Sequence, residues 1–213
     1  MIKTALILID LQNDFLPGGA LAVHEGDLVI PVANKLIEFA RKQDWFVLAT
    51  QDWHPVNHGS FAVNTPGAKI YDQGKLDGLP QVWWPVHCVQ GSHGAKLAQE
   101  LLIPDIIIQK GMHPNIDSYS GFFDNAHRAK TELNALLKKH HVQKLVVMGI
   151  ATDYCVKFTV MDALSLGYEV IVVNDGCRGV DMPNGSSDEA YNEIEKRGAV
   201  LISSYEIINN LQL

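Results

Sequence analysis

The chain has 213 residues, of which 47% are hydrophobic and 19% are charged. This balance buries enough apolar surface to exclude intrinsic disorder, and the length fits a single domain over residues 1–213. The net charge of -7 argues against nucleic acid and membrane surfaces as partners. Residues 1–9 carry too short an apolar run for a signal peptide or a spanning helix, so we expect a cytoplasmic protein.

Short apolar runs rich in Val and Ile alternate with helical patterns along the chain. The runs cover residues 5–9, 45–49, 105–108, 144–150, 168–173 and 199–202, and each is typical of a strand buried on both faces. Helical periodicity covers residues 29–40, with Asp27 as N-cap, and then residues 131–140, 153–166 and 188–197. This alternation predicts an α/β fold: a mainly parallel six-stranded sheet with helices on both faces.

Residues 52–91 interrupt the alternation with four prolines and five glycines. So long an irregular stretch inside a compact domain is usually functional, and we expect some interaction to tie it down. A second, shorter interruption at residues 111–125 follows the third predicted strand and is placed to cover a site.

Reactive side chains gather at the predicted strand ends. In an open parallel sheet the carboxyl ends of the strands meet at one crevice, and here they supply Asp10, Asp52, Lys110 and Cys155. Cys155 lies in the first turn of a helix, where the helix dipole and a nearby cation such as Lys110 favour a thiolate. Asp10 could then accept and return the thiol proton. The structural alternative is an inert buried thiol beside an ion pair of Asp10 and Lys110.

A candidate metal site spans the two ends of the 52–91 segment. Asp52 and His54 are one residue apart, so an extended chain points both side chains the same way. His87, near the far end of the segment, could close the loop onto the same ion. Two histidines and one aspartate with an open position suit zinc, iron or manganese. The alternative is three solvated polar side chains, and a fourth contact from His58 or Ser60 stays open.

Six motifs resemble those of the nicotinamidases, also called pyrazinamidases, in the isochorismatase-like cysteine hydrolase superfamily. In chain order they are LILIDLQNDF (6–15), QDWHPVNHGSF (51–61), WWPVHCVQG (83–91), KG (110–111), DSYSGFFDN (117–125) and GIATDYCV (149–156). The resemblance covers nearly the whole chain. It implies a Rossmann-like three-layer fold and hydrolysis of nicotinamide to nicotinate and ammonia in NAD salvage, with pyrazinamide as an analogue substrate.

The resemblance also implies roles for individual residues. Cys155 would be the nucleophile that forms a thioester, Asp10 the proton acceptor and donor, and Lys110 their electrostatic partner. Backbone amides of Ala151 and Cys155 would form the oxyanion hole, with a cis peptide bond before Ala151. Asp52, His54 and His87 would hold one divalent metal ion, with zinc expected first and iron or manganese as alternatives. Phe15, Trp84 and Tyr119 would form aromatic walls around the substrate ring. Ser60 matches the family's variable fourth metal contact better than His58 does.

Three other readings compete with this one. A metal-free cysteine amidase for carbamoyl or ureido substrates is disfavoured by the Asp52, His54 and His87 set. An isochorismatase, which works without a nucleophilic cysteine, is disfavoured by Cys155. A noncatalytic zinc-binding module would give Lys110 no purpose and would normally use four protein ligands. A homo-oligomer stays open, because one sequence does not reveal surface patches.

Overall fold

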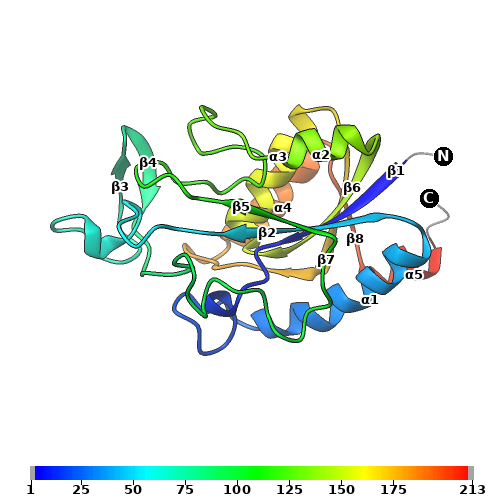
Figure 1. Cartoon of the computed structure of the whole chain (residues 1–213), viewed down its shortest axis with the longest axis horizontal. Helices are drawn as coiled ribbons and strands as arrows, with labels where there is room; N and C mark the ends of the chain where they lie inside the picture. Colours follow the sequence, from blue (N-terminus) through cyan, green and yellow to red (C-terminus); the bar gives the residue numbers. More distant parts are fainter. Residues whose placement is uncertain (1–2, 211–213) are drawn as a thin grey trace.

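A parallel sheet lies between two layers of helices in the computed structural model of the protein, which describes residues 3–210 (Figure 1). The first two and last three residues of the expected domain lie outside the described part. The sheet has six strands in the order β5-β2-β1-β6-β7-β8, and every neighbouring pair is parallel. These strands are β1 (Lys3–Ile9), β2 (Phe46–Asp52), β5 (Ile106–Lys110), β6 (Val142–Ile150), β7 (Glu169–Arg178) and β8 (Val200–Ile202). The predicted fold class is confirmed.

Five α-helices cover the two faces of the sheet within the described chain. Helices α1 (Val29–Lys42) and α5 (Ser204–Asn210) pack on one face, below the sheet in Figure 1. Helices α2 (Leu133–Lys139), α3 (Lys157–Ser165) and α4 (Ser186–Lys196) lie on the other face. The predicted N-cap at Asp27 is wrong, because this residue lies inside a 3-10 turn, η2 (Gly26–Leu28), that leads into α1. No described helix combines the length and the apolar character needed to cross a bilayer.

The central strands form the rigid part of the molecule. Residues 5–9 of β1 are fully buried, because strands pair with β1 on both sides and helices cover both faces. Apolar side chains of α1, among them Val29, Ala33, Leu36 and Ala40, recur at helical spacing and are also buried. The carboxyl ends of the strands are therefore held in fixed positions by the core beneath them.

The 52–91 segment contains a β-hairpin that projects from the sheet at the left of Figure 1. Strands β3 (Gln73–Leu76) and β4 (Leu79–Val82) are antiparallel and are joined by Asp77 and Gly78, both with positive φ. An Asp-Gly pair is common in such two-residue turns and is a sequence signal for a hairpin. The expectation of an irregular segment did not take this signal into account. Bridges between His54 and Val89 and between Phe61 and Trp84 join the two ends of the segment, so the expected tie is present.

Candidate active site

Four neighbouring strands bring four predicted site residues to one place. Asp10 directly follows β1, while Asp52 and Lys110 are the last residues of β2 and β5. Cys155 lies in a π-helical turn, η4 (Thr152–Val156), that follows β6 and leads into α3. Single π-turns of this kind are frequent at functional sites. The prediction of one helix over residues 153–166 missed this wider first turn.

Lys110 lies at the centre of this group. Its Nζ atom is 2.9 Å from Asp10 Oδ2, and it donates hydrogen bonds to Asp52 Oδ1 at 2.5 Å, to the Ser118 carbonyl oxygen at 2.9 Å and to Cys155 Sγ at 3.4 Å. The lysine and the Asp10 side chain have no exposed surface. Burying an ammonium group among two carboxylates and a thiol has a large desolvation cost, and such clusters occur most often at functional sites.

The electrostatic effects within the group are mutual. Burial lowers the pKa of Lys110, but Asp10 and Asp52 outweigh burial and raise this pKa well above its ordinary value. Lys110 is therefore a permanent cation. Burial raises the pKa of Asp10, and Lys110 opposes that shift only in part. A carboxyl group with a raised pKa is a better proton acceptor and donor near neutral pH.

The thiol of Cys155 differs from the sequence-based expectation of a thiolate. Burial raises its pKa well above the ordinary value, Lys110 lowers it, and the carboxylate of Asp10 raises it again. Burial therefore favours the thiol over the thiolate, and a thiol needs a base at the moment of attack. Cys88 and Cys177 are buried as well, and all three cysteines are free.

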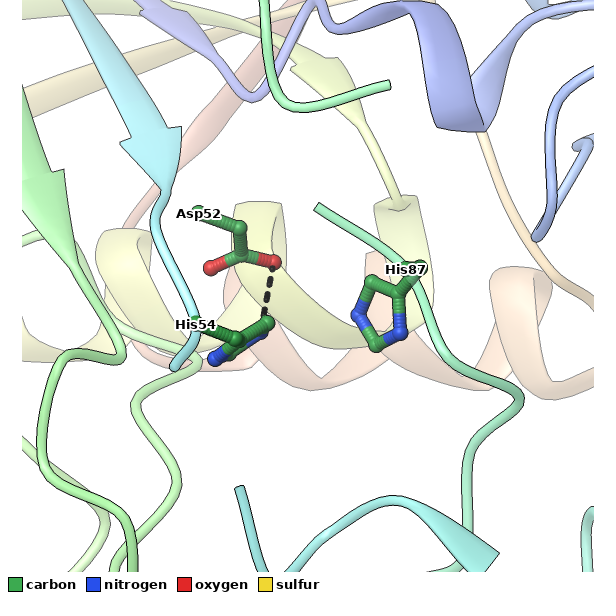
Figure 2. Close-up of side chains that lie close together, drawn as sticks. All are labelled: Asp52, His54 and His87. Carbon is green, nitrogen blue, oxygen red and sulfur yellow. Dashed lines mark ion pairs between the residues drawn. The ribbon is translucent and has the colours of Figure 1, made fainter. Parts of the chain in front are cut away.

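Asp52, His54 and His87 converge beside this group, with His87 arriving from a separate segment of the chain (Figure 2). Each offers one possible ligand atom, and these atoms lie within 4.8 Å of one another. Nδ1 of His54 is 2.8 Å from the carbonyl oxygen of Gly111, and Nδ1 of His87 is 2.8 Å from that of Pro85. Because a carbonyl oxygen only accepts, both Nδ1 atoms carry a proton, and in the neutral imidazoles the Nε2 atoms are the acceptors. Burial lowers the pKa of His54, but Asp52, 3.6 Å from its Nε2 atom, outweighs burial and raises this pKa (Figure 2); a bound metal ion would replace that Nε2 proton. Such outer hydrogen bonds are typical of metal-binding histidines.

His58 and Ser60, the two candidates for a fourth contact, interact with each other. Ser60 Oγ lies 2.7 Å from His58 Nδ1, while the buried Nε2 atom of His58 has no hydrogen-bond partner among the described residues. His58 also groups with His54 and Asp117 as a second possible ligand set. Both sets use His54, so the two possible metal positions are neighbours. Sequence reasoning missed Asp117, although it opens one of the quoted motifs.

A small pocket lies beside Cys155, and the space open in it to the centre of a water molecule is about 30 Å³. Ala151 and Cys155 both line it, and the peptide bond before Ala151 is cis, as expected. The three predicted aromatic residues line the same pocket, and so does a fourth that sequence reasoning missed; they are Phe15, Trp84, Tyr119 and Tyr154. The structure therefore brings the expected nucleophile, the candidate metal ligands and the expected aromatic walls around a single cavity.

Hydrogen bonds fix the aromatic wall of the pocket. The Tyr119 hydroxyl oxygen accepts from Gln81 Nε2 at 3.2 Å and from Trp84 Nε1 at 3.3 Å. Gln81 Nε2 also donates to Asp117 Oδ2 at 2.8 Å. Gln81 belongs to β4, so the projecting hairpin contributes to the wall. Its role could not be read from the sequence, because nothing local links Gln81 to Tyr119.

The comparisons with known proteins agree with this geometry. Residues 4–206 match the family model described as the isochorismatase domain, and the chain belongs to the isochorismatase family. It is 54% identical over 203 residues to the nicotinamidase of Escherichia coli, an alignment that covers 94% of this chain and 95% of that protein. The resemblance stated from the six motifs is thus confirmed.

Two solved structures are similar over almost their whole length. A nicotinamidase and pyrazinamidase of Acinetobacter baumanii superposes with a TM-score of 0.92 at 42% identity, covering 97% of this chain and 99% of that one. A pyrazinamidase of Pyrococcus horikoshii, solved in complex with zinc, gives a TM-score of 0.79 at 35% identity, covering 94% of this chain and 99% of that one.

Proposed function

We propose that this protein is a nicotinamidase, which hydrolyses nicotinamide to nicotinate and ammonia in NAD salvage and also accepts pyrazinamide. The observation that carries the proposal is the contact of Lys110 with both Asp10 and Cys155, together with the place of Cys155 in the wall of a cavity lined by aromatic residues. The close relationship to a nicotinamidase over nearly the full length supports the same substrate.

The chain's own residues account for the covalent steps. The sulfur of Cys155 attacks the amide carbon as its proton passes to Asp10, and Lys110 balances the charge that develops. Backbone amides of Ala151 and Cys155 donate hydrogen bonds to the oxyanion. The departing nitrogen takes the proton from Asp10, which leaves a thioester and ammonia. Asp10 then removes a proton from water as the water oxygen attacks the thioester carbon. When the C–S bond breaks, Asp10 returns this proton to the sulfur, and the acid product loses its remaining proton to solvent and leaves as nicotinate.

Asp52, His54 and His87 fit a divalent metal ion. One carboxylate and two imidazoles with an open position are a common donor set for zinc, iron or manganese. Burial lowers the pKa of His87 to about 4, so its imidazole is neutral and able to bind a metal. When bound, the ion supplies a Lewis-acid position for the pyridine nitrogen and so orients the ring. We propose zinc first, in line with the zinc complex of the related pyrazinamidase.

The charges around the cavity also favour a divalent ion. Asp10, Asp52 and Asp117 are buried carboxylates, and Lys110 is the buried ammonium among them. Acidic side chains outnumber the ammonium by three to one, and a divalent cation would balance this excess, which matters because buried charges without a partner are costly. For a further contact we favour His58 over Ser60, because the Ser60 hydroxyl already bonds to His58 and the histidine Nε2 has no partner among the described residues.

Phe15, Trp84 and Tyr119 would hold the flat pyridine ring. Their aromatic faces line the cavity, and an apolar slot with a few fixed polar groups suits a small aromatic amide. The histidine-rich set beside the thiol disfavours a metal-free amidase for ureido substrates, and Cys155 disfavours an isochorismatase. A structural zinc module would leave the Lys110 contacts without a purpose.

An ammonia-release assay tests the proposal. Purified protein is incubated with nicotinamide, pyrazinamide and benzamide, before and after treatment with a chelator. We expect turnover of the first two amides. We expect chelation to weaken the binding of nicotinamide far more than that of benzamide, which has no ring nitrogen. Absence of ammonia from nicotinamide would refute the function, whereas equal effects of the chelator on both amides would refute only the role of the metal.

We also propose that residues 1–213 form one domain that acts in the cytoplasm. Most of the buried hydrophobic residues that the structure describes form one continuous cluster around the sheet, which supports the single domain. Cell fractionation tests the location, and size-exclusion chromatography with light scattering decides whether the protein is a homo-oligomer.

A further inference from the structure

Thr50 makes two hydrogen bonds to the proposed proton carrier, Asp10. Its Oγ1 atom donates to Asp10 Oδ1 at 2.6 Å and accepts from the Asp10 backbone amide at 3.1 Å. Thr50 lies on β2, next to β1, and it is completely buried. Asp10 has a φ of 48°, in the left-handed region. One hydrogen bond fixes the carboxyl group and the other fixes the backbone of Asp10 against the same hydroxyl.

The two carboxyl oxygens of Asp10 have different surroundings. Oδ1 accepts the Thr50 hydrogen bond, whereas Oδ2 has no hydrogen-bond partner among the described residues. Lys110 Nζ is 2.9 Å from Oδ2, but its three protons are shared with three other acceptors: Asp52 Oδ1, the Ser118 carbonyl oxygen and Cys155 Sγ. Lys110 thus attracts Oδ2 by charge without saturating its lone pairs.

Cys155 is near enough to use that open position. Its sulfur and a carboxyl oxygen of Asp10 lie within 4.8 Å of each other. A proton placed on Oδ1 instead would make this oxygen a much weaker acceptor for the Thr50 hydroxyl. No other acceptor for that hydroxyl is found among the described hydrogen bonds, and a buried polar group without a partner is unfavourable by about tenfold to a hundredfold in population.

We propose that Thr50 is a positioning residue that makes Oδ2 of Asp10 the atom that carries the proton. In the attack step the S–H bond of Cys155 breaks and an Oδ2–H bond forms. In the release step the Oδ2–H bond breaks and the new N–H bond leaves with ammonia. This inference rests on the proposed function, because it assigns the path of a proton within that reaction.

Two substitutions at residue 50 separate the hydroxyl from the side-chain volume. Thr50→Val keeps the shape and removes the donor, whereas Thr50→Ser keeps the donor. On nicotinamide we expect Thr50→Val to lower kcat by about tenfold to a hundredfold with KM unchanged, since the lost donor orients the base without contacting substrate. Thr50→Ser should recover most of kcat. Metal content should equal that of the wild type in both variants.

Thr159→Val is the matched control. Thr159 is equally buried, and its hydroxyl accepts a hydrogen bond from the Gly121 amide at 2.9 Å, away from Asp10. Its loss should reduce the melting temperature about as much as Thr50→Val does while kcat is retained. If Thr50→Val does not fold, Thr50→Cys, a weaker donor of similar size, should show the same loss of kcat.

The outcomes are distinct. Wild-type kcat in Thr50→Val, or in Thr50→Cys where Val does not fold, overturns the inference and leaves the proposed function intact. A failure of Thr50→Ser to recover kcat, or a loss of metal that parallels the loss of kcat, also overturns it, because Thr50 would then act through packing or through Asp52. A wild-type protein that releases no ammonia overturns the proposed function and this inference with it.

Discussion

Replacing Lys110 with methionine removes the only ammonium that the described structure brings between Asp10 and Asp52. The side chain is fully buried and contacts carboxylate oxygens of both aspartates, at 2.9 Å and 2.5 Å. Breaking a buried ion pair by removing one partner costs about 3–5 kcal/mol of unfolding free energy. In a domain of this size each kcal/mol lowers the melting temperature by about 2–4 °C, so we expect a decrease of about 6–20 °C.

Thermal unfolding followed by circular dichroism measures this decrease, in the presence of a chelator so that a bound cation does not offset the missing charge. The double variant Lys110→Met/Asp10→Asn should recover part of the loss, because only one buried carboxylate then lacks a partner. Lys157→Met is the control: Lys157 is partly exposed and lies 3.6 Å from Glu193, and such a pair is worth about 0–1 kcal/mol. A melting temperature for Lys110→Met equal to that of the control would refute the reasoning.

Three further predictions concern the site. Cys155→Ala should abolish ammonia release while circular dichroism and metal content stay as in the wild type; appreciable remaining turnover would remove Cys155 as nucleophile. Gly111→Ala should weaken metal binding about tenfold to a hundredfold in a competition titration. A Cβ atom there would meet the His54 ring, and the φ of 67° favours glycine. Unchanged metal affinity would contradict His54 as a ligand. Tyr119→Phe removes the acceptor for Gln81 and Trp84, so KM for nicotinamide should rise by about tenfold with a smaller change in kcat; an unchanged KM would argue against Tyr119 as part of the substrate wall.

The central strands were predictable because they are buried on both faces and therefore appear as continuous apolar runs. The edge strands β5 and β8 differ from the expectation of burial on both faces, since Ile107 and Val200 are exposed. Strand β7 shows the limit of that signal. Prediction ended it at residue 173, but it continues to Arg178 through exposed Asn174 and Asp175. Its last residues pair with β6 after a register shift. That extension depends on the partner strand and leaves no periodic pattern in the sequence.

The site was predictable where topology alone fixes it. Asp10, Asp52, Lys110 and Cys155 follow from the rule that parallel strands end at a common edge. Thr50 and Gln81 do not, because their importance depends on the side chains that face them from distant parts of the chain. The direction of the Cys155 pKa was missed for a related reason: burial outweighs the effect of Lys110, and burial at one position cannot be read from neighbouring residues.

The order β5-β2-β1-β6 has a consequence for how this protein can vary. The reacting groups sit at one edge of four adjoining strands, while the connections that enter those strands, such as residues 43–45 and 140–141, lie at the opposite edge. Chain termini relocated to that distant edge, or a fused partner inserted there, would leave the spacing of the reacting atoms unchanged. The amino ends of these strands should therefore tolerate insertions, whereas changes at their carboxyl ends should disturb the reacting groups.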